Sequence, residues 1–454
     1  MDDAPENIDE CNEENQQALT PQEFSQLLQS QPRRKWQPGS DPRRQIHKVP
    51  PQIRVWVGPR SERLYDPNLV SLGPYHHGKP ELRRAEEFKY LCLDSCTGGD
   101  EERKTLLYNK VVEKINEIRE CYAEVEIVEK YDDKALALMM LLDGCFVIKF
   151  MQNVISQDKT DSLDWLHYLG KAASTAFATH DILLLENQIP FQVLKLLIIS
   201  LPDKETHEDL FQLYLTRIVT KDLNQAKIPR ENEDPPIHFL EACWRVSVEK
   251  HFSEQNPHQT SEKEETNYFS YTSSRPIMDL KAKGIRFRPR RSCSFMDIAF
   301  ESHAFYGELY LPVRYISDLT NAFLANMIAY EVSPKNKTKP AVLSYTIFMK
   351  SLIQSPEDVR ELVERGIILN TFGNYEQVVR VFKEADTFGC RDVLVFEDIR
   401  RRIDEHCRSR ANTWMADLVH TRFRSPWTAI ALFAAAFLLC LTFLQAFFTI
   451  RPVK

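Results

Sequence analysis

Two adjacent histidines, His76 and His77, are the first residues of this chain that suggest chemistry. They end the apolar run LVSLGPYHHG at residues 69–78, and imidazoles serve in proteins as metal ligands and general bases. Neighbouring side chains on a regular strand or helix point in different directions, so both rings cannot reach one ion. No Cys, His or Asp stands near them at a spacing typical of metal ligands. We therefore expect a structural pair in a turn, with a binding or catalytic role as the alternative.

Cys145, His180 and Asp181 offer a nucleophile, a base and an orienting carboxylate. Cys145, however, lies in the most apolar helical pattern of the chain, where burial disfavours the thiolate. Glu186 stands close to Pro190, which breaks helical structure and frees backbone groups that need polar partners. We expect Glu186 to cap this break, with a buried acid as the alternative.

The nucleotide-binding and hydrolase motifs GxGxxG, the P-loop, GxSxG and HExxH do not occur in the chain. The sequence therefore predicts no catalytic residue, no metal site and no cofactor.

A cluster of six basic residues follows the middle of the chain: Lys281, Lys283, Arg286, Arg288, Arg290 and Arg291. Such a cluster suits phosphate, an acidic partner or a membrane surface. Ile285 and Phe287 alternate with the arginines, which is typical of a strand with one solvated face. We prefer the solvated strand and keep Arg286, Arg288 and Arg290 as binding alternatives. The net charge of −7 argues against a general nucleic-acid binder.

The segment Trp427–Ile450 contains no charged residue. A helix of this length reaches about 36 Å, which exceeds the roughly 30 Å of a bilayer core. We therefore predict a transmembrane helix at residues 425–450, followed by a short tail at 451–454, as in tail-anchored proteins. Ala431 and Ala435 are small residues four apart, a spacing that allows helix pairing in a membrane.

Three further features indicate where the remainder of the protein lies. Arginines are denser before the predicted span than after it, which places the body in the cytosol by the positive-inside rule. The ten cysteines form no CxxC pair, as expected of reduced thiols. The acidic N-terminus has no apolar stretch of the kind found in signal peptides.

Residues 1–45 are acidic and then basic, and we expect them to be a disordered tail. Residues 46–424 are predicted to form a single large helical body that contains a polar loop at 253–275. The fold class is mainly α, with a small β-hairpin within residues 294–317 and one C-terminal transmembrane helix. Prolines favour an extended arm at 46–57. Predicted helices within the body include 104–125, 132–155, 181–188, 320–331, 341–354 and one that starts at Pro356.

Five blocks of the body carry a family resemblance: VSLGPYHHGKPEL (70–82), LLDGCFVI (141–148), HDILLLENQIPFQVL (180–194), LPVRYISDLTNAFLANMIAYE (311–331) and FMKSLIQSPEDVRELVERGII (348–368). In this order they resemble the plant family called domain of unknown function 247, and the ending 425–450 is similar to that family's membrane segment. The chain departs from the family at Phe88, where a His is expected, and at SSRPIMDLKAKGIRF before residue 288.

The resemblance implies a membrane-associated plant protein with no established enzymatic activity. Some members in grasses are implicated as pollen-side self-incompatibility determinants. We expect a membrane-anchored protein, held by Trp427–Ile450, that acts in recognition or signalling through an unknown protein partner. The alternatives are a membrane-tethered enzyme with a pocket around Glu186, His76 or His77, and a structural scaffold. The sequence predicts no oligomeric state.

Overall fold

A computed structural model describes residues 44–155, 171–201, 204–219, 234–248, 275–333, 336, 340–388, 394–408, 434–435 and 437–446. One compact unit of the chain begins at Arg44. The predicted tail 1–45 lies outside the described residues except for its last two, and the loop 253–275 lies outside them except for its last one. Most of the predicted span 425–450 and the whole tail 451–454 also lie outside them.

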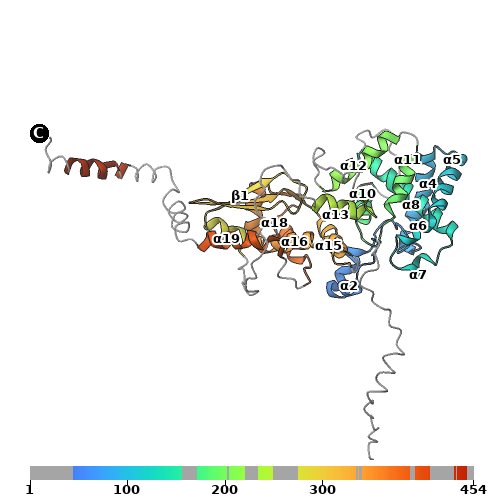
Figure 1. The fold of residues 1–454 in the computed structure, drawn as a ribbon, viewed down its shortest axis with the longest axis horizontal. Helices are drawn as coiled ribbons and strands as arrows, with labels where there is room; N and C mark the ends of the chain where they lie inside the picture. Colours follow the sequence, from blue (N-terminus) through green and yellow to red (C-terminus); the bar gives the residue numbers. More distant parts are fainter. Residues whose placement is uncertain are drawn as a thin grey trace, which may run out of the picture. The chain divides into compact units, whose positions relative to one another are not determined.

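The long helix α8 (Asp133–Ile155) is the centre of the first group of helices, as its apolar sequence predicts. Nearly every residue from Leu136 to Met151 is buried, because a helix without a polar face must be covered on all sides. Figure 1 shows this group in blue and green; α8 contacts α4 (Arg83–Thr97), α5 (Glu101–Glu113), α11 (Phe191–Ser200) and α12 (Lys204–Val219). Among the described residues, α8 alone is long and apolar enough to cross a membrane, but 78% of its apolar window is buried.

A three-stranded sheet follows in the order β1-β3-β2. Strands β2 (Ala299–Ser302) and β3 (Gly307–Pro312) pair antiparallel, so the predicted hairpin is confirmed. The basic segment supplies β1 (Ile285–Arg290), which pairs parallel with β3. Two shorter strands, β4 (Arg314–Ile316) and β5 (Ile368–Asn370), form a second parallel pair that the sequence did not predict.

Helices α15 (Thr320–Glu331) and α16 (Ala341–Leu352) lie at or near their predicted limits, and α17 (Pro356–Glu364) begins at Pro356 as predicted. Helix α18 (Tyr375–Glu384) follows them. Helix α17 starts at a capping box in which the side chains of Ser355 and Asp358 each bind the other residue's backbone N–H. The sequence SPED predicts this start, and the structure confirms it.

The shorter elements connect these groups and complete a mainly helical fold with small sheets. They are α2 (Pro51–Val57), η1 (Gly58–Arg60), α3 (Ser61–Tyr65), η2 (Pro80–Leu82), α6 (Ile115–Glu120), α7 (Val125–Val128), α10 (Lys171–Ile182), α13 (Phe239–Val248), α14 (Ile277–Ala282), η3 (Leu394–Phe396) and α19 (Glu397–Arg408).

Three local predictions were wrong. The arm 46–57 is extended only as far as Pro50; residues after it form helix α2, because Pro51 occupies the first helical position, where its missing N–H costs nothing. The helix predicted at 104–125 is interrupted at Lys114 and continues as α6. The helix predicted at 181–188 ends at Ile182, because the Gln188 side-chain amide donates hydrogen bonds to the carbonyls of Ile182 and Leu184.

His238, just before α13, gives the fold a pH dependence. Its ring is fully buried, and its Nδ1 accepts a hydrogen bond from the Glu241 backbone N–H at 3.1 Å. Burial lowers the pKa of His238 to about 3 from the ordinary 6.5. Between these two pH values the unfolded chain binds a proton at His238 that the native chain does not, so stability falls as the pH drops.

We expect the wild-type chain to lose about 2–3 kcal/mol of unfolding free energy between pH 6.5 and 4.5 through His238. His238→Asn keeps a side-chain acceptor for the Glu241 N–H and does not titrate, so its stability should fall less over that interval. Urea denaturation at the two pH values measures the difference, with His303→Asn on the exposed surface as the control. An equal loss in His238→Asn and wild type would contradict the assignment.

Candidate functional site

Residues 66–76 form an irregular segment inside the core, and side chains from distant elements satisfy its backbone. Buried N–H groups need partners. The Asp181 carboxylate accepts hydrogen bonds at 2.7–2.9 Å from three successive N–H groups, those of Asn68, Leu69 and Val70. Asn187 accepts one from the Leu72 N–H at 2.7 Å and donates one to the Val70 carbonyl at 3.0 Å. The sequence blocks 70–82 and 180–194 therefore lie side by side, and their polar groups form one buried layer.

A buried ion pair supports the same segment from the helices. Asp143 on α8 accepts a hydrogen bond from the Gly73 N–H at 2.7 Å and pairs with Lys89 of α4 at 2.6 Å. Lys89 also donates to the Ser71 carbonyl at 2.7 Å, and neither charged side chain is more than 1% exposed. Burial raises the pKa of Asp143, and the Lys89 ammonium opposes that rise.

Gly73 marks the closest approach of the two blocks. Its φ is +72°, and a Cβ placed there would lie 2.5 Å from the Gln188 carbonyl oxygen and 2.8 Å from the Tyr122 hydroxyl. Only glycine fits both the backbone conformation and the space.

The three residues of the ENQ sequence at the helix break, Glu186, Asn187 and Gln188, bind groups in two different regions of the fold. Asn187 and Gln188 satisfy backbone groups near the break. Glu186 does not cap the break: its carboxylate accepts a hydrogen bond at 2.8 Å from the N–H of Val49, a residue before α2. The prediction of a cap was wrong for Glu186, and the alternative, a buried acid, is confirmed by its 6% exposure.

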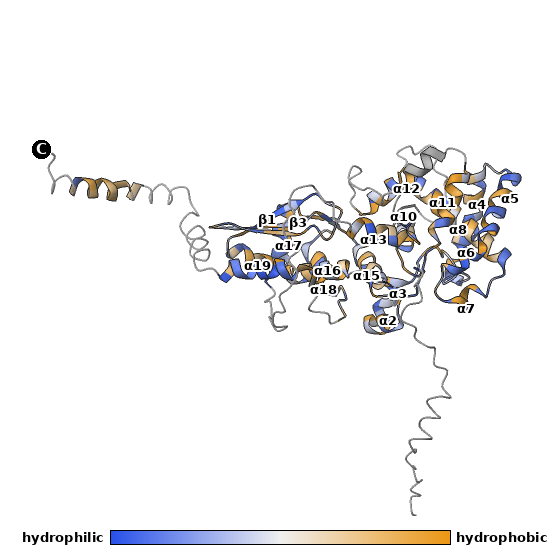
Figure 2. Ribbon diagram, in the orientation of Figure 1, coloured by the Kyte–Doolittle hydropathy of each residue, from blue (hydrophilic) through white to orange (hydrophobic). Residues whose placement is uncertain are grey.

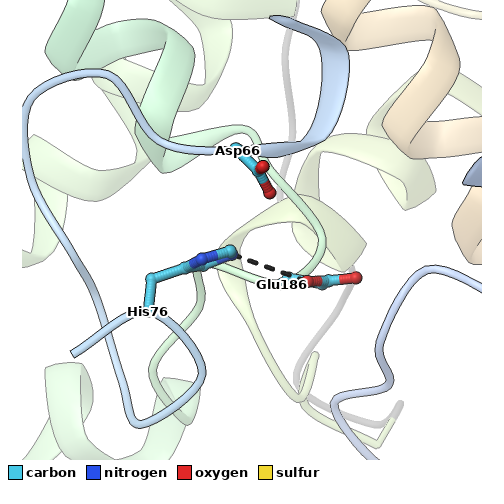
Figure 3. Close-up of side chains that lie close together, drawn as sticks. All are labelled: Asp66, His76 and Glu186. Atoms are coloured by element: carbon cyan, nitrogen blue, oxygen red, sulfur yellow. Dashed lines mark ion pairs between the residues drawn. The ribbon is translucent and has the colours of Figure 1, made fainter. Parts of the chain in front are cut away.

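Glu186, His76 and Asp66 come together beside this segment, in what we call the Asp66 cluster (Figure 3). One ligand atom from each residue lies within 4.8 Å of the others. His76 Nε2 lies 3.5 Å from Glu186 Oε2. Arg54 of α2 bridges the two carboxylates, because its Nη2 lies 3.0 Å from Asp66 Oδ1 and 3.0 Å from Glu186 Oε2.

The electrostatics of the Asp66 cluster follow from burial. His76 is 4% exposed, and burial, aided by Lys79, lowers its pKa to about 4. The imidazole is therefore neutral at pH 7. Burial raises the pKa of Glu186, and the nearby Arg54 opposes the rise. Neither ring nitrogen of His76 has a hydrogen-bond partner in the structure. The buried ring can both donate and accept a hydrogen bond, yet it forms none with the nearby carboxylates of Asp66 and Glu186. One imidazole and two carboxylates are donors that divalent metals accept.

The His77 side chain contacts a different set of residues from the His76 side chain, as expected of adjacent residues. Its Nδ1 lies 3.6 Å from Glu86 Oε2, and its ring meets the edge of Tyr131 at a centroid distance of 5.7 Å. The two histidines therefore do not share one site.

The nucleophile interpretation of Cys145 has no support in the geometry. A hydrogen bond with the neighbouring Cys96, together with burial, raises the pKa of the Cys145 thiol well above its ordinary value. The ring of His180 binds the Arg63 carbonyl, Asn68 and Asp181, while Asp181 serves the backbone of the irregular segment. His180 and Asp181 are structural, and the described cysteines are free thiols, as expected.

Arg286, Arg288 and Arg290 lie on β1 and contact side chains of the sheet and of its adjacent loops, which confirms the strand with a solvated face. Arg288 binds Glu308 at 2.8 Å and Arg290 binds Asp297 at 2.6 Å. Arg286 lies over the Tyr306 ring at 4.3 Å from the centroid. These contacts leave less charge available for a phosphate or an acidic partner than the sequence suggests.

Among the described residues, two other features resemble binding sites in their composition: a group of possible metal ligands and a cavity. Glu301, His303 and Glu308 lie close together at the surface, although Glu308 is already bound by Arg288. A cavity of about 420 Å³ lies between α5 and α11, with an apolar lining that includes Val111 and Leu196 and with Lys110 at its edge. Neither feature contains an unpartnered buried side chain.

Sequence reasoning named His76 and Glu186 separately but missed Asp66 and Arg54. Glu186 lies 132 residues from Arg54 in the sequence, and no spacing rule joins them. The only available signal was the position of Asp66 just before the LVSLGPYHHG block.

The fold and the site define a mainly helical protein in which an irregular segment is embedded in a buried polar layer. The chain belongs to the DUF247 family, described as "Plant protein of unknown function", which matches residues 46–441. Two proteins of Arabidopsis thaliana are similar to it. The UPF0481 protein At3g47200 is 28% identical over 426 residues, covering 88% of this chain and 85% of that protein. A second UPF0481 protein, At3g02645, is 24% identical over 477 residues, covering 84% and 86%. No solved structure matches the chain.

Proposed function

We propose that this protein is anchored in a membrane by its C-terminal segment and acts there by recognising a protein partner. The observation that carries the proposal is the helix Phe437–Ala446, whose large apolar side chains are exposed, with Phe437 at 66% and Phe443 at 75%. Figure 2 shows the hydrophobic colouring of this helix near the C-terminus. An apolar helix that none of the described residues covers requires another apolar environment. Its place inside the uncharged run Trp427–Ile450 favours lipid.

Helix α2 supports the recognition part of the proposal. Val55 and Trp56 are exposed at 81% and 63%, and tryptophan is among the residues that contribute most to protein interfaces. His76 and Glu186, the candidates for a catalytic role, have side chains that are only 5% and 7% exposed. A substrate would have little access to them, which favours recognition over catalysis. Signalling, and a relation to the self-incompatibility members of the family, remain part of this proposal.

The membrane proposal predicts that the full chain stays in the membrane pellet after an alkaline carbonate wash, whereas a chain ending at Arg424 is released. A full-length double variant, Leu439→Lys with Phe443→Lys, should also be released, because charges near the middle of a span are costly. The matched control, Leu439→Met with Phe443→Met, should stay in the pellet. Retention of the truncated chain would refute anchoring by this segment.

Orientation is tested on the same membranes. The chain contains the glycosylation sequon Asn336-Lys337-Thr338. With the body in the cytosol, protease added to sealed microsomes removes an N-terminal tag, and Asn336 is not glycosylated. A protected tag, together with a mass shift that Asn336→Gln abolishes, would place the body on the opposite side.

A partner test uses Trp56. Proximity labelling in plant cells should identify proteins that are enriched with wild type and lost with Trp56→Ala, while an exposed control, Leu106→Ala, retains them. Direct binding of one purified candidate, weakened only by Trp56→Ala, would support recognition. A set of labelled proteins unchanged by Trp56→Ala would exclude α2 as the recognition surface.

A further inference from the structure

We propose that Asp66, His76 and Glu186 bind a first-row divalent metal ion, and that Arg54 holds the two carboxylates in place until the ion displaces its guanidinium. The proposal does not depend on membrane anchoring or on the recognition of a partner. It concerns the Asp66 cluster alone.

The ligand set and its spacing fit such an ion. Zn²⁺ binds histidine nitrogen and carboxylate oxygen at about 2.0–2.2 Å, which separates neighbouring ligand atoms by roughly 3–3.6 Å. The 3.5 Å between His76 Nε2 and Glu186 Oε2 already has this value. All three ligand atoms lie within 4.8 Å of one another, so closure around an ion requires a shift of about 1 Å. Asp66 follows the end of α3 in extended backbone, and its side chain is 26% exposed, so it is the least enclosed of the three ligands.

His76 is the observation that points to a ligand. Buried polar groups in proteins nearly always have a partner, yet both nitrogens of this ring lack a hydrogen bond. The ring is 4% exposed, so bulk water does not satisfy it. Figure 3 shows the ring directed at Glu186, with Asp66 facing the space beside it. A metal ion at this position would give the imidazole the partner that it lacks.

Arg54 explains how the carboxylates stay together without an ion. Two ionised carboxylates and one guanidinium leave one negative charge in the cluster, and a divalent cation would balance the pair of carboxylates completely. Arg54 belongs to the short surface helix α2, and its side chain is 25% exposed. The guanidinium therefore has a path to solvent when the ion enters. Glu186 would keep its hydrogen bond from the Val49 N–H, which orients the carboxylate as a supporting contact.

The surface group Glu301, His303 and Glu308 provides the contrast. His303 is exposed and lies beside Tyr306, while the Glu308 carboxylate is bound by both Arg288 and Tyr310. That group has no buried ligand without a partner, and it serves as an internal control for adventitious binding.

The test is titration calorimetry of the metal-stripped, full-length chain in mild detergent, with Zn²⁺ as the probe and Mn²⁺ and Mg²⁺ in parallel. We expect one Zn²⁺ per chain, weaker Mn²⁺ binding and little Mg²⁺ binding, since Mg²⁺ prefers oxygen ligands alone. His76→Gln removes a direct ligand and should weaken Zn²⁺ binding by at least the roughly ten- to a hundred-fold that loss of an outer-shell partner costs, and Asp66→Asn should also weaken it. Arg54→Met, which removes the competing cation, should strengthen it. His77→Gln and His303→Gln should bind as wild type does.

X-ray absorption at the zinc edge supplies a second measurement that does not depend on the stability of any variant. One imidazole and two carboxylate ligands should appear at about 2.0–2.2 Å. Sulfur neighbours at about 2.3 Å would place the ion on a cysteine and overturn the proposal. The absence of stoichiometric binding, or binding unchanged by both His76→Gln and Arg54→Met, would overturn it as well.

Discussion

Gly73→Ala is expected to lower the unfolding free energy by about 2–5 kcal/mol. The φ of +72° costs an L-residue about 1–2 kcal/mol. The added Cβ would stand 2.5 Å from the Gln188 carbonyl oxygen, and such overpacking costs typically 1–3 kcal/mol more. Backbone atoms on both sides of this contact belong to the buried polar layer, so neither side moves without loss of hydrogen bonds. Urea denaturation of the full chain in mild detergent measures the change.

Gly366→Ala is the matched control for this experiment. Its φ of +69° is nearly that of Gly73, but a Cβ there meets no atom within 4 Å. Gly366→Ala should therefore show the conformational cost alone, about 1–2 kcal/mol. Similar losses in the two variants would mean that the blocks around Gly73 are not in close contact.

Lys89→Met is the second substitution with a large expected effect. It leaves the Asp143 carboxylate buried without its counter-ion, and removal of one member of a buried pair costs about 3–5 kcal/mol. The Ser71 carbonyl also loses its donor. We expect the variant to unfold at much lower urea concentration and to lose the protection of residues 66–76 against hydrogen exchange first.

Two further variants separate charge from packing. Lys114→Met breaks an exposed pair with Glu117 and should change stability little. Asp143→Asn in the Lys89→Met background removes the unpaired charge while keeping an acceptor for the Gly73 N–H, so the double variant should be more stable than Lys89→Met alone. If the double variant were the less stable of the two, the buried charge would not be the cause.

The elements that sequence reasoning predicted correctly are those specified by local pattern. The apolar run of α8 requires burial, SPED specifies a helix start, and the alternation after residue 294 specifies a hairpin. Helix α2 was missed because two prolines mark an extended segment and a helix start equally well, and only the residues that follow distinguish them.

The candidate site was predicted only in part, for a different reason. Glu186 and His76 were identified from residue type, but their neighbourhood depends on tertiary contacts between segments more than a hundred residues apart. Asp66 looks like an ordinary loop residue and Arg54 like an ordinary surface cation. Their roles follow from the path of the irregular segment, which has no periodicity for a sequence pattern to detect.

The polar layer around residues 66–76 also has a consequence for the synthesis of the protein. The acceptors for the backbone of this segment, Asp143, Asp181 and Asn187, lie between 70 and 115 residues further along the chain. When the segment leaves the ribosome, the side chains that will hold it have not yet been translated. Contacts of such long sequence separation form slowly, and a chain waiting for them exposes apolar surface. The irregular segment 66–76 therefore cannot complete its set of backbone hydrogen bonds until the ENQ sequence has emerged.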